Sequence, residues 1–414
     1  MEEIADVCQH YTSSCEWRDV LMVSDRLQLI SPSATLQLNA RVQELAAEGK
    51  DVVKFGVGEP DFPTPDYIKE KAIEAIEGNK TTYTPASGIP ELRKAVCKKF
   101  AEDNGLEYEP SQVLISVGAK HSIYNAFVAL VNDGDEVIVP APYWVSYPEQ
   151  VKLAGGVPVI LQTTEETDFK VTPEMLEDAV SSRTRVIILN SPSNPTGSVY
   201  TPDELAALGA FLAEHGIWAI CDDIYEYLVY DGAVHVSLPT AAPEMKPLSV
   251  VVNGVSKAYA MTGWRIGYAA GPTDVIKAMA TVQEHATSNA TSISQWAALA
   301  ALEGPKETVA EMVRAFDERR IYMTERLQNI PGFECTAPKG AFYVFPNVRQ
   351  LIGQKMDGRT ITDADMLAEV LLEEVYVAAV PGSGFGAPEN IRFSYATSMD
   401  KIEEGMDRIE KLLG

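Results

Sequence analysis

Short apolar runs that alternate with helical patterns are the feature of this 414-residue chain that most restricts its fold. Residues 137–139, 186–189 and 248–252 are rich in valine, isoleucine and leucine. Such runs are typical of parallel strands, which are buried on both faces because crossover helices cover the sheet. Four more runs of this kind are expected in the same sheet, at 113–117, 157–161, 217–221 and 266–269. We therefore predict a large α/β domain with a mostly parallel sheet covered by helices on both faces.

Helices are predicted where apolar residues recur every three or four positions. In the large domain they cover 66–76, 90–100, 120–131, 173–180 and 202–215. After about residue 304 the pattern changes: a long charged helix over 306–328 precedes strands at 340–345, 375–380 and 391–395 and helices at 363–374 and 399–413. This later pattern predicts a smaller α+β domain.

The expected organisation has three parts. Residues 1–24 form an N-terminal extension without a clear period, and residues 64–304 form the large domain. Residues 25–63 and 305–414 form the smaller domain, which is discontinuous because the amphipathic helix near Thr35 is expected, by fold precedent, to pack on the C-terminal part.

Charge and cysteine content exclude several classes of protein. The formal net charge is −25, from 34 basic and 59 acidic residues, which argues against binding nucleic acid or an anionic membrane. No apolar run approaches the roughly 20 residues of a membrane span. Five scattered cysteines and an acidic N-terminus favour the cytoplasm, and no Cys or His pair has a metal-binding spacing, so we expect no metal.

Polar residues stand out where the predicted strands end, which is where ligands bind in parallel α/β sheets. Gly118, Ala119 and Lys120 open a helix whose backbone N–H groups can bind a phosphate, although an ordinary tight turn has the same residues. Trp144 follows the strand at 137–139 as a stacking platform or a core aromatic residue. Asn194 offers an amide before a proline, either to a ligand or within a rigid turn.

The carboxylate and the amine of this set are the most informative members. Asp222 follows an apolar strand and is expected to be buried, so it needs a cationic partner unless it only caps a helix. Lys257 lies between two apolar runs, where a lowered pKa would make its amine a nucleophile able to form a Schiff base. The alternative is a loop lysine whose ammonium group reaches water. With Tyr225 and Arg265, these residues match the aldehyde, pyridine nitrogen, phenolate oxygen and phosphate of pyridoxal phosphate.

The chain resembles the class I/II aminotransferases of pyridoxal-phosphate fold type I, and is similar to the prokaryotic-type aspartate aminotransferases. The most specific motif is Ser-Lys-Ala-Tyr-Ala-Met-Thr-Gly-Trp-Arg at 256–265. Further motifs lie at 58–62, 83–88, 142–148, 193–197, 222–226 and 391–396. The likeness covers about residues 25–414.

The resemblance implies a role for each candidate residue. Lys257 would form the Schiff base and move the proton of the substrate Cα, and Asp222 would pair with the pyridinium nitrogen. Arg392 would bind the substrate α-carboxylate, which Gly58 and Asn194 would help to orient. Trp144 would stack on the cofactor ring and also contact the substrate. The remaining cofactor contacts are expected from these residues: Gly118, Ala119, Lys120, Trp144, Asn194, Tyr225, Ser256, Arg265 and, from the other subunit of a homodimer, Tyr83.

The resemblance also indicates a substrate. The stretch at 283–292 has no arginine of the kind that animal-type aspartate enzymes use for the substrate side chain, whereas Lys120 and Thr35, with Ser33 nearby, match the prokaryotic type. We therefore expect L-aspartate and 2-oxoglutarate as substrates. The alternatives are prephenate, aromatic or alanine transamination, and a β-lyase or cyclopropane-carboxylate synthase on the same cofactor. A non-catalytic regulator would need a DNA-binding domain, for which the extension is too short and too acidic.

Overall fold

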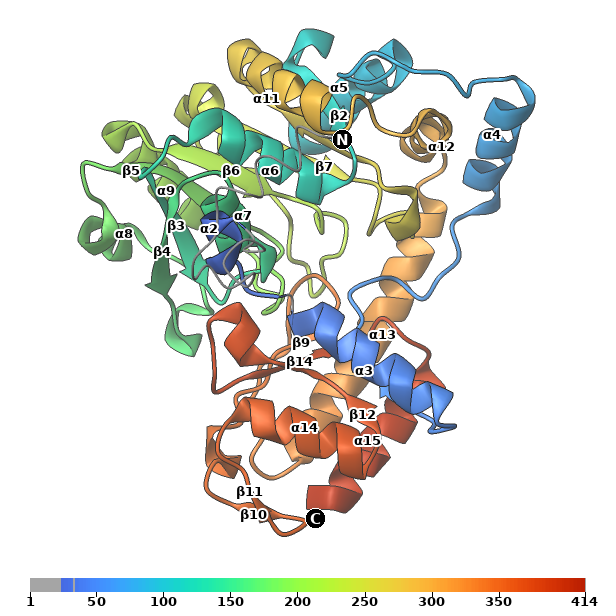
Figure 1. The fold of residues 1–414 in the computed structure, drawn as a ribbon, viewed down its shortest axis with the longest axis vertical. Helices are drawn as coiled ribbons and strands as arrows, with labels where there is room; N and C mark the ends of the chain where they lie inside the picture. The colour runs from blue at the N-terminus through green and yellow to red at the C-terminus, as the bar shows by residue number, and fades with distance from the viewer. Residues whose placement is uncertain (1–23, 33, 414) are drawn as a thin grey trace, which may run out of the picture.

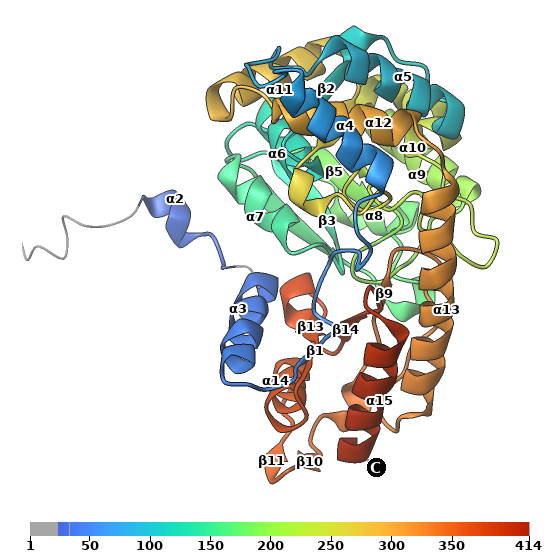
Figure 2. The same cartoon turned by 90° about the vertical axis from the view of Figure 1, so that its right-hand side faces the viewer.

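The computed structural model describes residues 24–32 and 34–413, so most of the predicted extension and Ser33 lie outside it. Figure 1 shows a large upper part built around one sheet and a smaller lower part. Helix α13 (Glu307–Asn329) runs along both parts, as the turned view in Figure 2 also shows. The fold is the predicted α/β architecture with a smaller α+β unit.

The large sheet has seven strands in the order β2-β8-β7-β6-β5-β3-β4. Five of them match predicted runs closely, and β8 is the one antiparallel member, paired with β7 and β2. The remaining neighbours pair in parallel, which confirms the mostly parallel sheet. The strands are β2 (Val113–Ser116), β3 (Glu136–Ala141), β4 (Val157–Gln162), β5 (Thr184–Asn190), β6 (Trp218–Asp222), β7 (Ser249–Gly254) and β8 (Gly267–Ala270).

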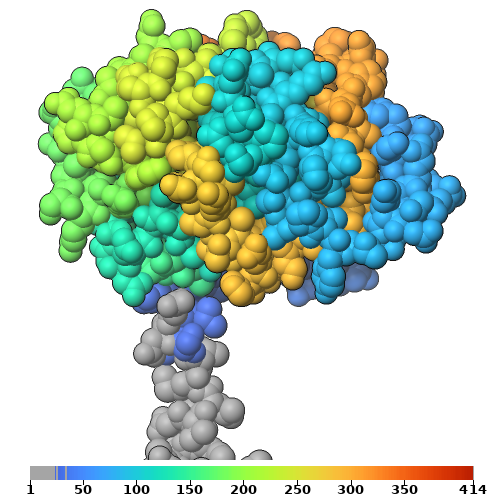
Figure 3. Space-filling view, turned by 90° about the horizontal axis from the view of Figure 1, so that it is seen from above, coloured from blue at the N-terminus to red at the C-terminus, as the bar shows by residue number. Residues whose placement is uncertain are grey.

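Helices cover the sheet, and Figure 3 shows one face of this cover from above, with α4 (blue) at its edge. The helices of this part are α4 (Asp66–Glu77), α5 (Pro90–Asn104), α6 (Ala119–Leu130), α7 (Ser146–Leu153), α8 (Pro173–Ala179), α9 (Pro202–His215), α10 (Leu238–Ala241), α11 (Thr273–Ala286) and α12 (Ser292–Glu303). The sequence-based prediction lacked α7, the short α10, α11 and α12. Helix α12 is apolar on most sides because it is packed within the fold, so it has no clear amphipathic period.

The smaller part combines short strands with helices. A three-stranded antiparallel sheet has the order β13-β14-β9, and β1 pairs in parallel with β12. Its elements are α3 (Ala34–Ala47), β1 (Val53–Lys54), β9 (Tyr343–Val344), β10 (Lys355–Met356), β11 (Arg359–Thr360), α14 (Ala364–Glu374), β12 (Val377–Ala378), β13 (Val380–Pro381), β14 (Ile391–Ser394) and α15 (Met399–Leu413), with the short α2 (Asp25–Gln28) before them. Val42 and Leu45 of α3 share a core with Leu372 and Ala378. The domain boundaries themselves stay a prediction.

A glycine in β8 allows the first turn of α6 to lie directly on the sheet. A Cβ atom at Gly267 would overlap the backbone nitrogen of Ala119, the first residue of that helix. Gly118 precedes the helix with φ +83°, a conformation that L side chains rarely adopt. These two glycines therefore fix where the N-terminus of α6 points.

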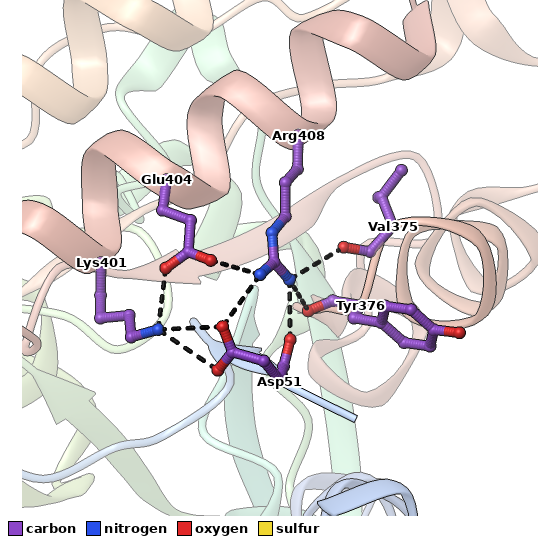
Figure 4. Close-up of polar contacts among 6 residues, drawn as sticks. All are labelled: Asp51, Val375, Tyr376, Lys401, Glu404 and Arg408. Atoms are coloured by element: carbon purple, nitrogen blue, oxygen red, sulfur yellow. Dashed lines mark hydrogen bonds and ion pairs between the residues drawn. The ribbon is translucent and has the colours of Figure 1, made fainter. Parts of the chain in front are cut away.

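Arg408 of α15 connects three segments of the smaller part (Figure 4). Its guanidinium donates hydrogen bonds to the carbonyl oxygen of Asp51 at 2.7 Å and to those of Val375 and Tyr376 at 3.3 and 3.5 Å. The two latter carbonyls follow the C-terminus of α14. The group also binds the carboxylates of Asp51 and Glu404. A single side chain thus holds the ends of α14 and the chain before β1 together.

In the residues that the structure describes, none of the helices is long and apolar enough to cross a membrane.

Arg408→Met should lower the free energy of unfolding by about 1 to 2 kcal/mol, because it removes the hydrogen bonds by which one side chain joins Asp51, Val375 and Tyr376. Urea unfolding followed by circular dichroism measures this loss. Arg349→Met is the matched control, since Arg349 makes an exposed ion pair with Glu389 and should leave the midpoint unchanged. Equal losses in the two variants would contradict the structural role of Arg408.

Candidate active site

A cavity of about 390 Å³ lies beyond the carboxyl ends of β5, β6 and β7. Most of the predicted site residues line it: Thr35, Gly58, Ala119, Lys120, Trp144, Asn194, Asp222, Tyr225, Ser256, Lys257, Arg265 and Arg392. Gly118 directly precedes Ala119 at the same turn. Tyr83 is the predicted residue that lies apart, with 90% of its surface exposed. The structure therefore brings together side chains that span more than 350 positions of the sequence, and it places them where ligands of parallel sheets bind.

Lys257 lies in the loop between β7 and β8, and its amine points into the cavity. The Nζ atom donates a hydrogen bond of 2.6 Å to the carbonyl oxygen of Gly58. Burial lowers the pKa of Lys257 to about 8, while the nearby charge of Glu59 opposes this shift. A substantial fraction of this amine is therefore neutral near pH 8, which is the form that attacks a carbonyl carbon.

Asp222 ends β6 and is 4% exposed. Its carboxylate accepts hydrogen bonds from the Tyr147 hydroxyl at 2.7 Å and the Ile224 N–H at 3.3 Å. Burial raises the pKa of Asp222 to about 6, and the bond from Tyr147 opposes the rise. Within the described part of the chain, no basic side chain pairs with it at 4 Å or less. The expected cationic partner must then come from a ligand.

Arg392 is buried, at 2% exposure, on β14 of the smaller part. Its guanidinium donates to the Asn194 side-chain oxygen at 2.8 Å and to the Gly56 carbonyl at 3.0 Å, and it lies 4.4 Å from the Tyr343 ring centre. Its Nε atom has no hydrogen-bond partner among the described residues. A buried guanidinium that is matched only by neutral oxygens fits a carboxylate, which accepts two parallel hydrogen bonds.

The N-terminus of α6 and Arg265 form an anion site on the same wall. A Cβ atom at Gly118 would overlap the Arg265 guanidinium, so the glycine lets the arginine lie against the turn. Arg265 is held by a hydrogen bond of 2.9 Å to the Thr262 carbonyl. Free N–H groups of a helix N-terminus beside a guanidinium suit a phosphate.

Two more predicted residues face the cavity from this side. The Lys120 ammonium lies 4.6 Å from the centre of the Trp144 ring. Burial, and then the charge of Arg265, lower the pKa of Lys120. Thr35 reaches the cavity from α3, across from the large sheet.

Three residues that line the cavity were missed as site residues from the sequence. Tyr147 binds Asp222, and the Tyr343 hydroxyl lies 2.9 Å from that of Tyr225. Glu59 accepts a hydrogen bond of 2.7 Å from Thr262. Tyr147 follows Trp144 by three positions, a helical spacing that could have placed it beside the tryptophan. No local signal marks Tyr343, because a strand from the distant smaller part carries it.

The set of groups fits pyridoxal phosphate. An amine with a lowered pKa matches the aldehyde, a buried carboxylate without a cation matches the ring nitrogen, and the Gly118 turn with Arg265 matches the phosphate. Tyr225 and Asn194 supply a hydroxyl and an amide for the ring oxygen. The guanidinium of Arg392 remains for a substrate carboxylate.

Known proteins agree with this geometry. Residues 50–409 match the family described as Aminotransferase class I and II. The chain is 52% identical to an aspartate aminotransferase of Geobacillus stearothermophilus, over 95% of this chain and 99% of the relative. It is 50% identical to an aspartate/prephenate aminotransferase of Cereibacter sphaeroides, over 94% of this chain and 98% of that one.

Solved structures give the same result. The aspartate aminotransferase of Rhizobium meliloti superimposes with a TM-score of 0.92 at 42% identity, covering 95% of this chain and 99% of that one. The Thermus thermophilus aspartate aminotransferase with maleate has a TM-score of 0.89 at 42% identity, with 95% and 100% covered. The chain therefore belongs to the class I and II aminotransferases, which are pyridoxal-phosphate enzymes.

Proposed function

We propose that this aminotransferase moves the amino group of L-aspartate to 2-oxoglutarate. The observation that carries the proposal is that one cavity contains Arg392 and Lys120, two cationic side chains for the two carboxylates of such a substrate. The names of the relatives support this choice, since several are aspartate aminotransferases and one solved relative holds maleate, a dicarboxylate.

Each side chain of the cavity has its own role in the proposed reaction. Bound pyridoxal phosphate supplies an aldehyde that condenses with amines and a ring that accepts electrons. Lys257 holds the aldehyde and, once its amine is free, takes the proton from the substrate Cα. Asp222 keeps a proton on the ring nitrogen. Arg392 binds the α-carboxylate, and Asn194 and Gly58 orient it.

The other residues hold the cofactor and the distal end of the substrate. Trp144 stacks on the ring, and Tyr225 donates to its oxygen. Gly118, Ala119, Ser256 and Arg265 would bind the phosphate, and Lys120 lies close to the same turn. Lys120 and Thr35 then bind the side-chain carboxylate of the substrate.

Prephenate is a second candidate substrate, because relatives at 50% and 48% identity are named aspartate/prephenate and probable aspartate/prephenate aminotransferases. Prephenate also has a second carboxylate that Lys120 can bind. Direct comparison of the two amino acceptors, oxaloacetate and prephenate, with L-glutamate as the donor measures the preference.

We also propose a homodimer in which Tyr83 binds the cofactor phosphate of the neighbouring subunit. The loop with Tyr83 is exposed at its tip but fixed at its base by two buried glutamines. Gln283 donates to the Ala86 carbonyl at 2.7 Å, and Gln295 accepts from the Ile89 N–H at 2.8 Å. A well-held loop with an exposed aromatic tip suits a contact with a second copy. The cytoplasmic location stays a prediction from the cysteine content.

Lys257→Ala should reduce transamination by a factor of about 10³ or more, since it removes both the amine that holds the cofactor and the base at the Cα. Oxaloacetate formed from aspartate is followed by its reduction with NADH and malate dehydrogenase. Lys277→Ala, an exposed lysine of α11, is the control and should keep the wild-type rate. Near-normal turnover by Lys257→Ala would refute the proposed mechanism.

Lys120→Ala should raise the KM for aspartate by roughly ten- to a hundredfold, the effect of losing one charge-assisted hydrogen bond. The KM for phenylalanine should change much less, because its side chain has no carboxylate. Steady-state kinetics with both amino donors measure the difference. A similar loss for both substrates would mean that Lys120 does not select the acidic side chain.

Co-expression of Lys257→Ala with Tyr83→Ala subunits tests the dimer. A mixed dimer has one complete site, which combines Lys257 of one chain with Tyr83 of the other. Mixed dimers isolated with two different tags should therefore be far more active than either variant alone. Activity no higher than that of the parents would show that Tyr83 does not act across subunits.

A further inference from the structure

Two consecutive buried carboxylates lie at the end of β6: Asp222 is its last residue and Asp223 follows it, and the two have different surroundings. Asp222 and Asp223 are 4% and 3% exposed. Successive side chains of a strand point to opposite sides, so only Asp222 lines the cofactor cavity. Asp223 instead accepts a hydrogen bond from the Ser237 hydroxyl, and its Oδ2 lies 3.4 Å from Nε2 of His235. Asp223, which lies behind the cavity, has a basic partner in His235. Asp222, which lines the cavity, has no basic partner among the described residues.

His235 is held in the interior, where its side chain is 5% exposed. Burial alone would lower the pKa of His235, but the nearby charge of Asp223, and then that of Glu226, raise it above its usual value. Lys99 opposes this rise, although it is itself bound to Glu226 in a buried ion pair with Asn104. The geometry and charges favour an imidazolium that faces the Asp223 carboxylate.

We propose that His235 is a positioning residue that neutralises Asp223 and so keeps Asp222 ionised for the protonated ring nitrogen of the cofactor. The inference rests on the proposed role of Asp222. A negative charge at Asp223 without a counter-ion would favour the protonated form of its neighbour, because like charges disfavour ionisation. With an imidazolium beside it, Asp223 presents a dipole to Asp222, and the field of a dipole falls off faster than that of a charge.

The pKa of Asp222 depends on the charge of Asp223 as well as on the groups that contact Asp222 directly. The groups that face Asp222 are Tyr147, Asp223 and Lys257, in addition to the Ile224 N–H. The Tyr147 hydrogen bond and Lys257 lower the pKa of Asp222, whereas Asp223 raises it. Removing the positive partner of Asp223 therefore makes Asp222 bind its proton more tightly, and a protonated Asp222 cannot pair with a cationic ring.

The affinity of the cofactor-free protein for pyridoxal phosphate, measured by equilibrium dialysis between pH 5 and 8.5, tests the proposal without turnover. In the wild type the affinity should rise with pH as Asp222 ionises near pH 6. In His235→Gln this rise should move up by about one pH unit, and the Kd at pH 6 to 7 should increase by up to about tenfold. Adding Asp223→Asn should restore the affinity to near the wild-type value, since the uncompensated charge is then gone.

The double variant separates a charge effect from a packing effect. An unchanged pH dependence in His235→Gln, or a double variant that binds no better than His235→Gln, would overturn the proposal. Circular dichroism shows whether each variant is folded. If His235→Gln does not fold, His235→Asn takes its place with the same expected result. Asp223→Asn alone should then leave the midpoint close to the wild-type value, because His235 already offsets the charge of Asp223. A fall of the midpoint by about one pH unit in Asp223→Asn would show that this charge is not offset and would overturn the proposal.

Asp222→Asn distinguishes the failure of this inference from the failure of the proposed function. It should weaken cofactor binding and retain only the pH dependence of the cofactor itself, which is then subtracted from the other curves. Wild-type binding by Asp222→Asn would remove the role of Asp222 and the inference with it. Weakened binding by Asp222→Asn together with unaltered binding by His235→Gln would remove the inference alone.

Discussion

Burial of ionised groups without ionised partners is the constraint on which this structure depends. A charged side chain is expensive to remove from water, and it is tolerated when hydrogen bonds hold it and a ligand later completes it. Asp222 is held by Tyr147 and Ile224, and Arg392 by Asn194 and the Gly56 carbonyl. The cavity therefore contains a carboxylate and a guanidinium that have hydrogen bonds but no ionic partner. A cationic ring would pair with the carboxylate, and an anionic substrate would pair with the guanidinium.

The backbone makes this arrangement possible by allowing close approaches. Gly267 lets the first turn of α6 lie on β8, and Gly118 lets Arg265 lie against that turn. A side chain at Gly118 or Gly267 would displace the N-terminus of α6 or Arg265, and so move this anion site away from Lys257. Lys257 follows β7, the strand next to β8. The location of the proposed phosphate site thus depends on two glycines, Gly118 and Gly267, which have no side chain.

Most of the large sheet could be predicted, because buried parallel strands leave short apolar runs rich in valine and isoleucine that alternate with helical patterns. The site residues at strand ends were predictable for the same reason, since a polar residue directly after such a run lies at the edge of the sheet. Helices α7 and α12 could not be predicted from a stripe of apolar residues: α12 is apolar nearly all round, and α7 contains a proline. Strand β1 is short, Val53–Lys54, because a single short neighbour, β12, pairs with it.

Contacts between distant segments were beyond a reading of local pattern. The pairing of Tyr343 with Tyr225, and the position of His235 beside Asp223, depend on how loops return to the sheet. The assignment of Arg392 to the cavity likewise came from resemblance to a family and not from its surroundings in the chain. The roles of the individual site residues remain proposals that the geometry supports.

The hydrogen bond between Arg392 and Asn194 joins the two parts of the molecule. Arg392 belongs to strand β14 of the smaller part, and Asn194 belongs to a loop that follows β5 of the large sheet. A carboxylate that binds both Arg392 and Asn194 would therefore favour the arrangement in which the smaller part lies against the large part. By thermodynamic linkage, a carboxylate that binds more tightly to this arrangement than to another would stabilise it by that difference in binding free energy. Binding of the carboxylate and packing of the two parts would then be coupled, and a ligand without the carboxylate would lack this coupling.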